Sequence, residues 1–168
     1  MVFLRIELKM DSQSKKSTRI LKVKLKTSRG RKLSSTKWLE RQLNDPYVIL
    51  AKKEGYRSRS AYKILEIDNK FNFLKPGKKV IDLGCAPGGW SQVASERTNS
   101  NGLKNKQKVG KVFGVDLTQI EPIKGVDFLN LDFSLNSSSK KIKKIINCKV
   151  DVVMSDMAAP SSGHKKTD

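Results

Sequence analysis

Four short apolar segments in the second half of the chain each end at or beside an aspartate, and this pattern narrows the possible folds. The segments cover residues 78–83, 111–117, 126–133 and 150–156. Helical patterns follow the first and the third, and such alternation is typical of a parallel sheet with right-handed crossovers. The last segment is nearly all apolar, as expected for a strand covered on both faces. We therefore predict an α/β fold with a mostly parallel sheet and helices on both faces.

The residues before the first strand predict short helices. One is expected over TKWLERQL, residues 36–43. The next has Asp45 as its N-cap, Pro46 as its first helical residue and Gly55 as its C-terminal stop, because each residue type favours that position.

Two amphipathic helices flank the strands. The first is predicted over residues 58–74, with Ser60 as N-cap and an apolar stripe of Ile64, Ile67, Phe71 and Leu74. Lys63 lies beside this stripe, so its amine could reach a cleft. The second is a basic helix over residues 137–147, and its inward side chains are expected to be Ile142, Ile145 and Ile146.

The loop after the first strand, GCAPGGW at residues 84–90, combines three glycines with a proline. In doubly wound sheets, ligands bind beyond the carboxyl ends of the strands. Glycines let the backbone approach a ligand closely, and N–H groups at the start of the next helix point into the same space. The spacing is not G-x-G-x-x-G, which counts against a pyrophosphate and therefore against NAD.

The carboxylates at the strand ends favour a cationic ligand. They belong to Asp82, Asp116, Asp132 and Asp156. A single such aspartate is commonly a turn or cap residue, but four after four successive strands favour a shared site. An acid after the second strand is suited to accept hydrogen bonds from ribose hydroxyls. S-adenosylmethionine, a sulfonium that carries ribose and adenine, fits this pattern.

Positive charge is concentrated in the first half of the chain. The whole sequence has 35 Lys and Arg against 16 Asp and Glu, and residues 1–79 hold 22 of the basic and 7 of the acidic residues. This excess favours nucleic-acid binding over a merely solubilising role or a membrane surface. We predict a basic flexible arm over residues 1–35 and a folded domain over residues 36–168. The arm is expected to contact phosphates without reading sequence, although a solubilising tail would have the same composition.

Few residues are available for metal or nucleophilic chemistry. Cys85 and Cys148 are the only cysteines, without CxxC spacing, and His164 is the only histidine. We therefore predict no disulfide framework, no metal site and no Ser-His-Asp catalysis. A reducing, cytoplasmic location fits best, and no apolar run approaches transmembrane length.

Several longer motifs together resemble a known family. They are DLGCAPGGWSQ, GVDL, GVDFLNLDF and VVMSDMAAP, preceded by KWLERQLNDPYVILAKKEGYRSRSAYKILEI. Between about Ser34 and Gly163 the chain is similar to the FtsJ/RrmJ ribosomal RNA 2′-O-methyltransferases. The resemblance implies a Rossmann-like fold and S-adenosylmethionine as cofactor. It also implies methylation of a ribose 2′-hydroxyl in large-subunit ribosomal RNA, with uridine as the expected target.

The resemblance also implies residue roles. Lys63 and Asp156 match the first Lys and the Asp of the family's Lys–Asp–Lys–Glu catalytic tetrad, and both are predicted to be catalytic. The predicted cofactor-binding residues are Asp82, Gly84, Pro87, Gly88, Gly89, Trp90, Asp116, Leu117, Asp132, Phe133 and Asp156.

The chain departs from the family pattern after its fourth strand. The family's last strands, and with them the second Lys and the Glu of the tetrad, have no counterpart before Asp168. We therefore expect an incomplete domain with low turnover. The alternatives are a non-catalytic S-adenosylmethionine- or RNA-binding protein and a tRNA or cap 2′-O-methyltransferase of the same superfamily. The expected partner is ribosomal RNA or the large ribosomal subunit, without a membrane, and a complete protein would be monomeric.

Overall fold

A computed structural model describes residues 32–132 and 138–157, together with Leu25 and Gly30. It separates into two compact units, Met1–Asn44 and Asp45–Asp168. Each unit is described by itself below.

The described part of the first unit is mainly one helix, α1 (Leu33–Leu43). It confirms the helix predicted over residues 36–43 and begins three residues earlier. Beyond the last turn, the side-chain amide of Asn44 donates to the carbonyl of Glu40 at 2.6 Å, and its backbone N–H donates to the same carbonyl at 3.2 Å. Most of the predicted arm over residues 1–35 lies outside the described residues.

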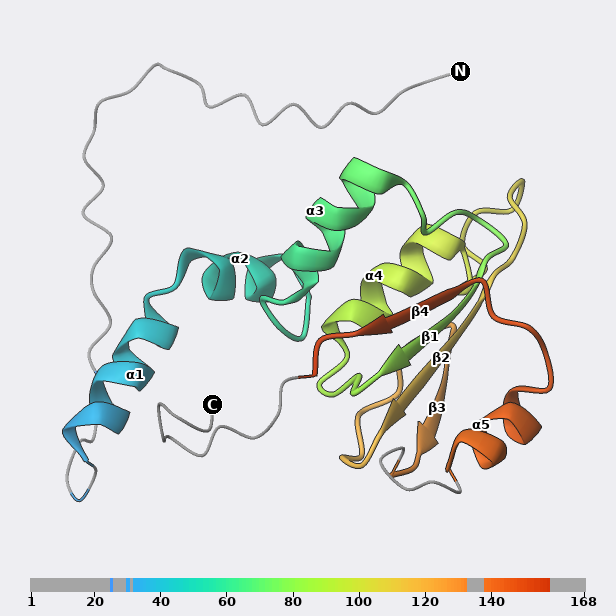
Figure 1. Ribbon diagram of the computed structural model, residues 1–168. Coiled ribbons are helices and arrows are strands. Elements are labelled where there is room, and N and C mark those ends of the chain that lie inside the picture. The colour runs from blue at the N-terminus through green and yellow to red at the C-terminus, as the bar shows by residue number, and fades with distance from the viewer. Residues whose placement is uncertain (1–24, 26–29, 31, 133–137, 158–168) are drawn as a thin grey trace, which may run out of the picture. The chain divides into compact units, whose positions relative to one another are not determined.

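The second unit contains a four-stranded sheet with the order β3-β2-β1-β4, and every neighbouring pair is parallel (Figure 1). The elements in chain order are α2 (Pro46–Glu54), α3 (Ala61–Phe71), β1 (Lys79–Leu83), α4 (Gly89–Thr98), β2 (Lys111–Asp116), β3 (Val126–Asn130), α5 (Ser138–Ile146) and β4 (Val152–Ser155). All four predicted strands and the parallel sheet are confirmed.

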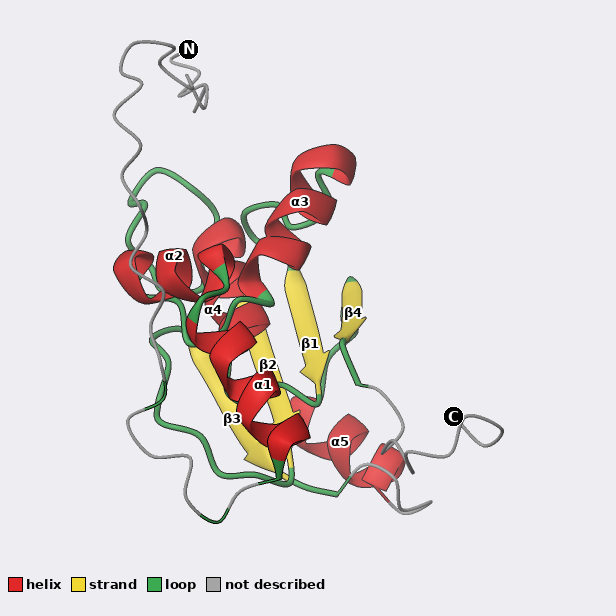
Figure 2. Ribbon diagram, turned by 90° about the vertical axis from the view of Figure 1, so that its left-hand side faces the viewer, coloured by secondary structure: helices red, strands yellow, loops and turns green. Residues whose placement is uncertain are grey.

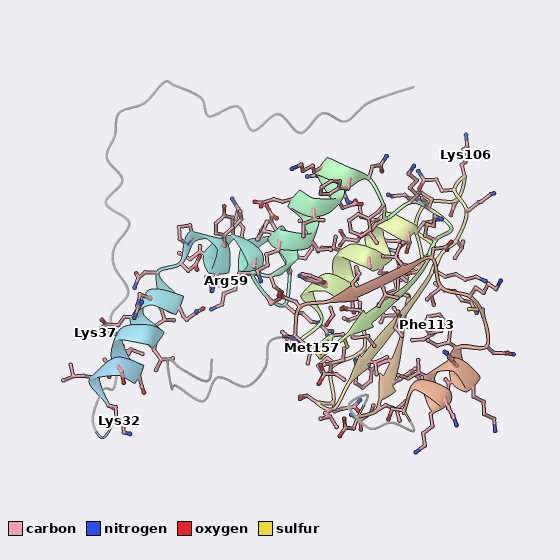
Figure 3. The ribbon with its side chains drawn as sticks, viewed as in Figure 1. Lys32, Lys37, Arg59, Lys106, Phe113 and Met157 are labelled. Carbon is pink, nitrogen blue, oxygen red and sulfur yellow. The ribbon has the colours of Figure 1, made fainter. Side chains whose placement is uncertain are left out.

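Alternating side chains of the strands cover the two faces of the sheet. Even-numbered Val80, Val112 and Met154 pack with α3 and α4, while odd-numbered Ile81 and Phe113 pack toward Ile146 of α5. Figures 1 and 2 show α3 and α4 on one side of the sheet and α5 on the other, and Figure 3 shows Phe113 above α5. The prediction of helices on both faces is confirmed.

The ends of α2 agree with the sequence. The Asp45 carboxylate accepts a hydrogen bond from the backbone N–H of Tyr47 at 2.9 Å, and Pro46 is the first helical residue. Gly55 ends the helix in the left-handed conformation, with φ of 80°.

The predicted start and end of α3 need correction. Ser60 precedes the helix, but its backbone is already α-helical and its side chain makes no cap bond. Its hydroxyl lies 2.6 Å from that of Ser58 instead. The helix ends at Phe71 because Asn72 takes the left-handed conformation, so Leu74 is buried beyond the helix rather than in it.

Four side chains predicted to face inward are exposed. Ile64 is buried as expected, but the exposed fractions are 41% for Ile67, 66% for Phe71, 53% for Ile145 and 62% for Val153. Val153 belongs to β4, whose only neighbour among the described strands is β1. In the described part of the chain β4 is thus an edge strand, and the 62% exposure of Val153 shows that its face is largely uncovered at this position, contrary to the prediction that both faces are covered.

Candidate active site

The site lies at the carboxyl end of the sheet, where the strand β1 passes into the glycine-rich loop before α4. Asp116, at the end of the neighbouring β2, fixes this loop. Its carboxylate accepts hydrogen bonds from the backbone N–H groups of Ala86 and Thr118, both at 2.8 Å. Because β1 and β2 are parallel, the carboxylate at the end of β2 lies against the loop that follows β1.

Asp82 is the buried carboxylate of the site, with 2% of its surface exposed. The hydroxyl of Ser91 on α4 donates to it at 2.6 Å. Burial raises the pKa of Asp82 to about 6; the Ser91 hydrogen bond opposes this, and the negative charges of Asp116 and Asp156 add to it. A positive charge brought near these acids would therefore be stabilised.

A small cavity opens beside the loop, and we call it the glycine-loop cavity. It has a volume of about 70 Å³ and is lined by Ser60, Asp82, Gly84, Cys85, Ala86, Pro87, Gly89, Trp90 and Asp156. Six of these lining residues belong to the predicted cofactor-binding set. Ligand pockets usually measure about 300–1,000 Å³, so this cavity encloses only part of a nucleoside-sized molecule.

The other predicted cofactor-binding residues do not line this cavity. Asp116 contacts the cavity only indirectly, because its carboxylate accepts a hydrogen bond from the backbone N–H of the lining residue Ala86. Gly88 is buried, Leu117 is 64% exposed, and Asp132 follows β3 in a half-buried position. Phe133 lies outside the described residues.

The loop requires glycine at two positions, because the backbone there has a positive φ and because a Cβ atom would overlap a neighbouring side chain. Gly84 has φ of +73°, and a Cβ there would overlap the side chain of Met157. Gly88 has φ of +112°, and a Cβ there would lie 2.5 Å from Ile123 Cδ1 and 3.3 Å from Arg57 Cδ. The protein's own side chains therefore fill the space that these glycines leave, and this packing shapes the loop.

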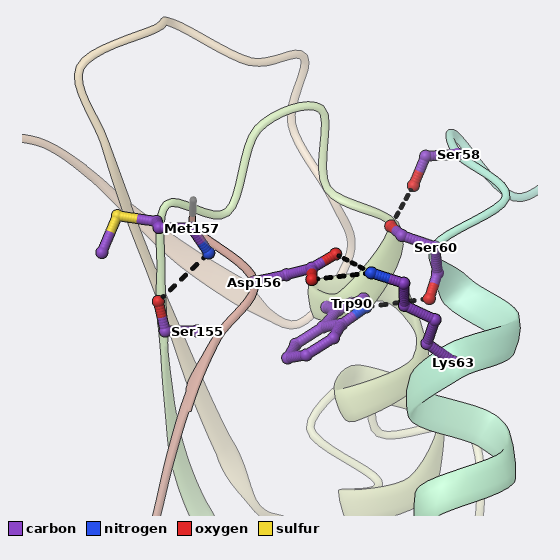
Figure 4. A network of polar contacts seen from close by, with 7 residues as sticks. All are labelled: Ser58, Ser60, Lys63, Trp90, Ser155, Asp156 and Met157. Carbon is purple, nitrogen blue, oxygen red and sulfur yellow. Dashed lines mark hydrogen bonds and ion pairs between the residues drawn. The ribbon is translucent and has the colours of Figure 1, made fainter. Parts of the chain in front are cut away.

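The two predicted catalytic residues are brought together although they lie far apart in the sequence. Lys63 of α3 donates to the two carboxylate oxygens of Asp156 at 2.9 and 3.2 Å, just after β4 (Figure 4). The neighbouring Trp90 ring donates its N–H to the carbonyl of Ser60 at 2.8 Å, which fixes the start of α3 against α4. The pair is partly open to solvent, with exposed side-chain fractions of 63% for Lys63 and 39% for Asp156.

Arg57 is a site-supporting residue that the sequence did not reveal. Its guanidinium donates to the carbonyls of Pro87 at 3.4 Å, Glu121 at 2.6 Å and Pro122 at 2.8 Å. Its backbone N–H donates to the side chain of Gln92 at 2.8 Å. One arginine thus joins the segment before α3, the glycine-rich loop and the loop after β2.

A larger pocket adjoins the Lys63–Asp156 pair, and both residues line it. We call it the tyrosine pocket; it measures about 460 Å³ and is lined by Tyr47, Arg59, Ser60, Tyr62, Lys63, Glu66 and Asp156. Ser60 and Asp156 line both this pocket and the glycine-loop cavity. Sequence reasoning missed its aromatic residues, although alternating aromatic and basic residues in PYVILAKKEGYRSRSAYK were an available signal.

Other site types find little support in the described part of the chain. There, no group of three or more His, Cys, Asp or Glu side chains is arranged to hold a metal ion. Both cysteines are free, and burial raises the pKa of Cys85 to about 12, with Asp82 and Asp116 adding to the shift. None of the described helices combines the length and apolar character needed to span a bilayer.

Residues 56–168 match the sequence model of the FtsJ-like methyltransferase family. The chain belongs to the FtsJ-like methyltransferase family. The matched region contains α3, the glycine-rich loop and β4, and therefore both sides of the Lys63–Asp156 pair.

Curated relatives and a solved structure agree with this membership. The chain is 61% identical to ribosomal RNA large subunit methyltransferase E of Cereibacter sphaeroides, over 92% of this chain and 64% of the relative. It is 59% identical to the protein of the same name from Ruegeria pomeroyi, over 92% of this chain and 66% of that protein. The chain thus spans just under two thirds of the length of these relatives.

A crystal structure named as a ribosomal RNA methyltransferase of Plasmodium falciparum superimposes with a TM-score of 0.56 and 39% sequence identity. The match covers 67% of this chain and 62% of that one. It supports the Rossmann-like arrangement of parallel strands and flanking helices described above.

Proposed function

We propose that the protein transfers a methyl group from S-adenosylmethionine to a ribose 2′-hydroxyl of large-subunit ribosomal RNA. The observation that carries this proposal is the Lys63–Asp156 pair, which lies where the glycine-loop cavity meets the tyrosine pocket. A methyl donor on one side and a hydroxyl on the other would meet at this pair. The relatives' names support ribosomal RNA as the substrate.

The charge of the glycine-loop cavity suits a sulfonium cofactor. Its described lining includes Asp82 and Asp156 and no Lys or Arg. We assign the cationic end of the cofactor to this lining, beside Trp90. We assign the ribose hydroxyls to Asp116, whose carboxylate accepts a hydrogen bond from the Ala86 N–H of the loop. Because the cavity is small, the remaining cofactor contacts would lie outside it, and the predicted set offers Leu117 and Asp132 for them.

The chemistry requires positioning more than strong acid–base catalysis. S-adenosylmethionine supplies an electrophilic methyl group on a positively charged sulfur. Asp156 would accept the hydrogen bond of the 2′-hydroxyl and point its oxygen toward that methyl group. As the 2′-oxygen takes the methyl group and the sulfur–methyl bond breaks, the hydroxyl proton would leave to solvent. Lys63 orients the Asp156 carboxylate through two hydrogen bonds. Its positive charge would also stabilise the partial negative charge that the 2′-oxygen gains as its proton leaves.

The proposed substrate also sets the partner and the location. The large ribosomal subunit is the proposed partner, and the cytoplasm is the proposed compartment. The basic excess of the chain favours a polyanionic partner, since each neutralised phosphate releases counterions. Two free cysteines are compatible with a reducing compartment.

Transfer of label from S-adenosylmethionine to undermethylated large ribosomal subunits tests the proposal. We expect the wild-type chain to incorporate label, and Lys63→Ala to lower the rate roughly 100- to 1,000-fold, as for other removed donors at developing charge. Lys70→Ala, in the last turn of the same helix, is the matched control and should keep the wild-type rate.

Cofactor binding must be measured in parallel. If the wild-type chain binds S-adenosylmethionine but transfers no label, the protein is a non-catalytic binding protein. Equal rates for Lys63→Ala and Lys70→Ala would remove Lys63 from the catalytic site.

A further inference from the structure

The tyrosine pocket is large enough for one nucleotide and has an aromatic wall. The rings of Tyr47 and Tyr62 have centroids 5.5 Å apart with planes tilted by 49°. Tyr56 supports Tyr62 from another side, with centroids 5.8 Å apart in an edge-on arrangement. The Tyr62 hydroxyl donates to Glu54, the last residue of α2, at 2.7 Å, so this ring of α3 is held against α2. Tyr47 is 50% exposed and remains available for contact.

Charged groups of both signs complete the lining. Arg59 and Lys63 are exposed cations, and each already contacts a carboxylate, Arg59 that of Asp45 and Lys63 that of Asp156. Glu66 adds a further acid. Such a balanced lining is poorly suited to a run of phosphates. It is suited to a nucleoside with one adjacent phosphate, which Arg59 can contact through its planar guanidinium.

We infer that the tyrosine pocket holds the base of a single unstacked nucleotide of the RNA. In this arrangement Tyr47 stacks on the base and Arg59 contacts its phosphate, so that the ribose lies at the Lys63–Asp156 pair. This assignment rests on the proposed function for the identity of the substrate. An A-form duplex offers its 2′-hydroxyls on a shallow groove, whereas stacking on aromatic side chains requires a base splayed out of its helix. The protein would therefore select single-stranded or opened RNA.

Binding of fluorescent octauridylate, compared with a short RNA duplex, tests the inference on the full chain. Salt should be high enough to weaken contacts of the basic arm. Tyr47→Ala should weaken binding of octauridylate about 5- to 150-fold, the usual range for losing one stacked base. Tyr47→Phe keeps the ring and should bind like the wild type. Duplex binding should be the same for all three proteins.

Wild-type binding of octauridylate by Tyr47→Ala, or equal losses on single strand and duplex, would overturn the inference. If Tyr47→Ala does not fold, Arg59→Gln replaces it as the test. That variant should reduce the slope of log affinity against log salt by about 0.7 on octauridylate, as expected for one lost phosphate contact on a single strand. An unchanged slope would contradict the assignment of Arg59.

The two proposals fail in different ways. If the wild-type chain methylates ribosomal subunits while Tyr47→Ala keeps wild-type KM and octauridylate affinity, the nucleotide pocket is wrong and the enzyme assignment stands. If no label is transferred but octauridylate binding depends on the Tyr47 ring, the pocket assignment stands and the enzyme assignment fails.

Discussion

The glycine-loop cavity and the tyrosine pocket meet at one ion pair but are built differently. The first is small, and its walls come from strand ends and a loop; Asp82 of β1 is 2% exposed and Cys85 of the loop is 4% exposed. The second is larger and is lined mainly by side chains at or beside α2 and α3, such as the half-exposed Tyr47. Backbone geometry therefore fixes the proposed donor side, and side chains carried on helices shape the proposed acceptor side.

The largest expected effect comes from the buried carboxylate of the glycine-loop cavity. The pKa of Asp82 rises from 3.8 to about 6 in the folded protein. Its contribution to stability is therefore fully present below pH 4 and is lost as pH rises through about 6. The free energy of unfolding of the wild type should fall, relative to Asp82→Asn, by up to about 3 kcal/mol between pH 4 and pH 7.

Urea unfolding at both pH values measures this difference. Asp127→Asn, an exposed position on β3, is the control and should follow the wild type. A constant difference between Asp82→Asn and the wild type would show that Asp82 is not perturbed. That result would also weaken the contrast between the buried glycine-loop cavity, proposed for the methyl donor, and the open tyrosine pocket, proposed for the acceptor.

The two arginines of GYRSRS sharpen the comparison, because one supports the cavity and the other faces the pocket. Arg57 donates to three backbone carbonyls, so Arg57→Ala should lower the free energy of unfolding by about 2 kcal/mol. Arg59 is exposed and makes a surface ion pair with Asp45, so Arg59→Ala should change stability by less than about 1 kcal/mol. Its loss should appear in RNA affinity instead. Equal destabilisation by both variants would contradict the division between the two regions.

A smaller effect is expected from a pair of glycines with similar backbone conformations. Gly84 and Gly102 have φ of +73° and +68°, but only at Gly84 would a Cβ meet another side chain, that of Met157. Alanine at either position should cost about 1–2 kcal/mol through backbone strain. Only Gly84→Ala should also weaken S-adenosylmethionine binding, which calorimetry can measure. Equal affinities for the two variants would show that the cavity tolerates a change in its loop.

The sheet could be predicted from the sequence because its signals are local. Continuous apolar runs that end in Asp82, Asp116 and Asp156 define strands, and parallel pairing then places those ends at one edge. The N-cap Asp45 and the stop Gly55 are equally local, because each acts on the adjacent helix turn.

Side-chain orientation and pocket shape were harder to predict because they depend on tertiary packing. The apolar periodicity of α5 predicted that both Ile145 and Ile146 face inward, but only Ile146 is buried and Ile145 is exposed. Ser60 lost its expected cap role because its hydroxyl bonds to Ser58. The tyrosine pocket was missed because Tyr47 and Tyr62 lie on separate helices. The Lys63–Asp156 pair, 93 residues apart, was anticipated through the family resemblance and not through spacing.

The position of the transferred methyl group tests the central claim most directly. RNA from large ribosomal subunits labelled by the wild-type chain can be hydrolysed in alkali, which cleaves only next to a free 2′-hydroxyl. If the donor lies in the glycine-loop cavity and a ribose lies at Lys63–Asp156, the label should be found in alkali-resistant dinucleotides. Label in mononucleotides would mean methylation of a base, and would contradict this account of the site.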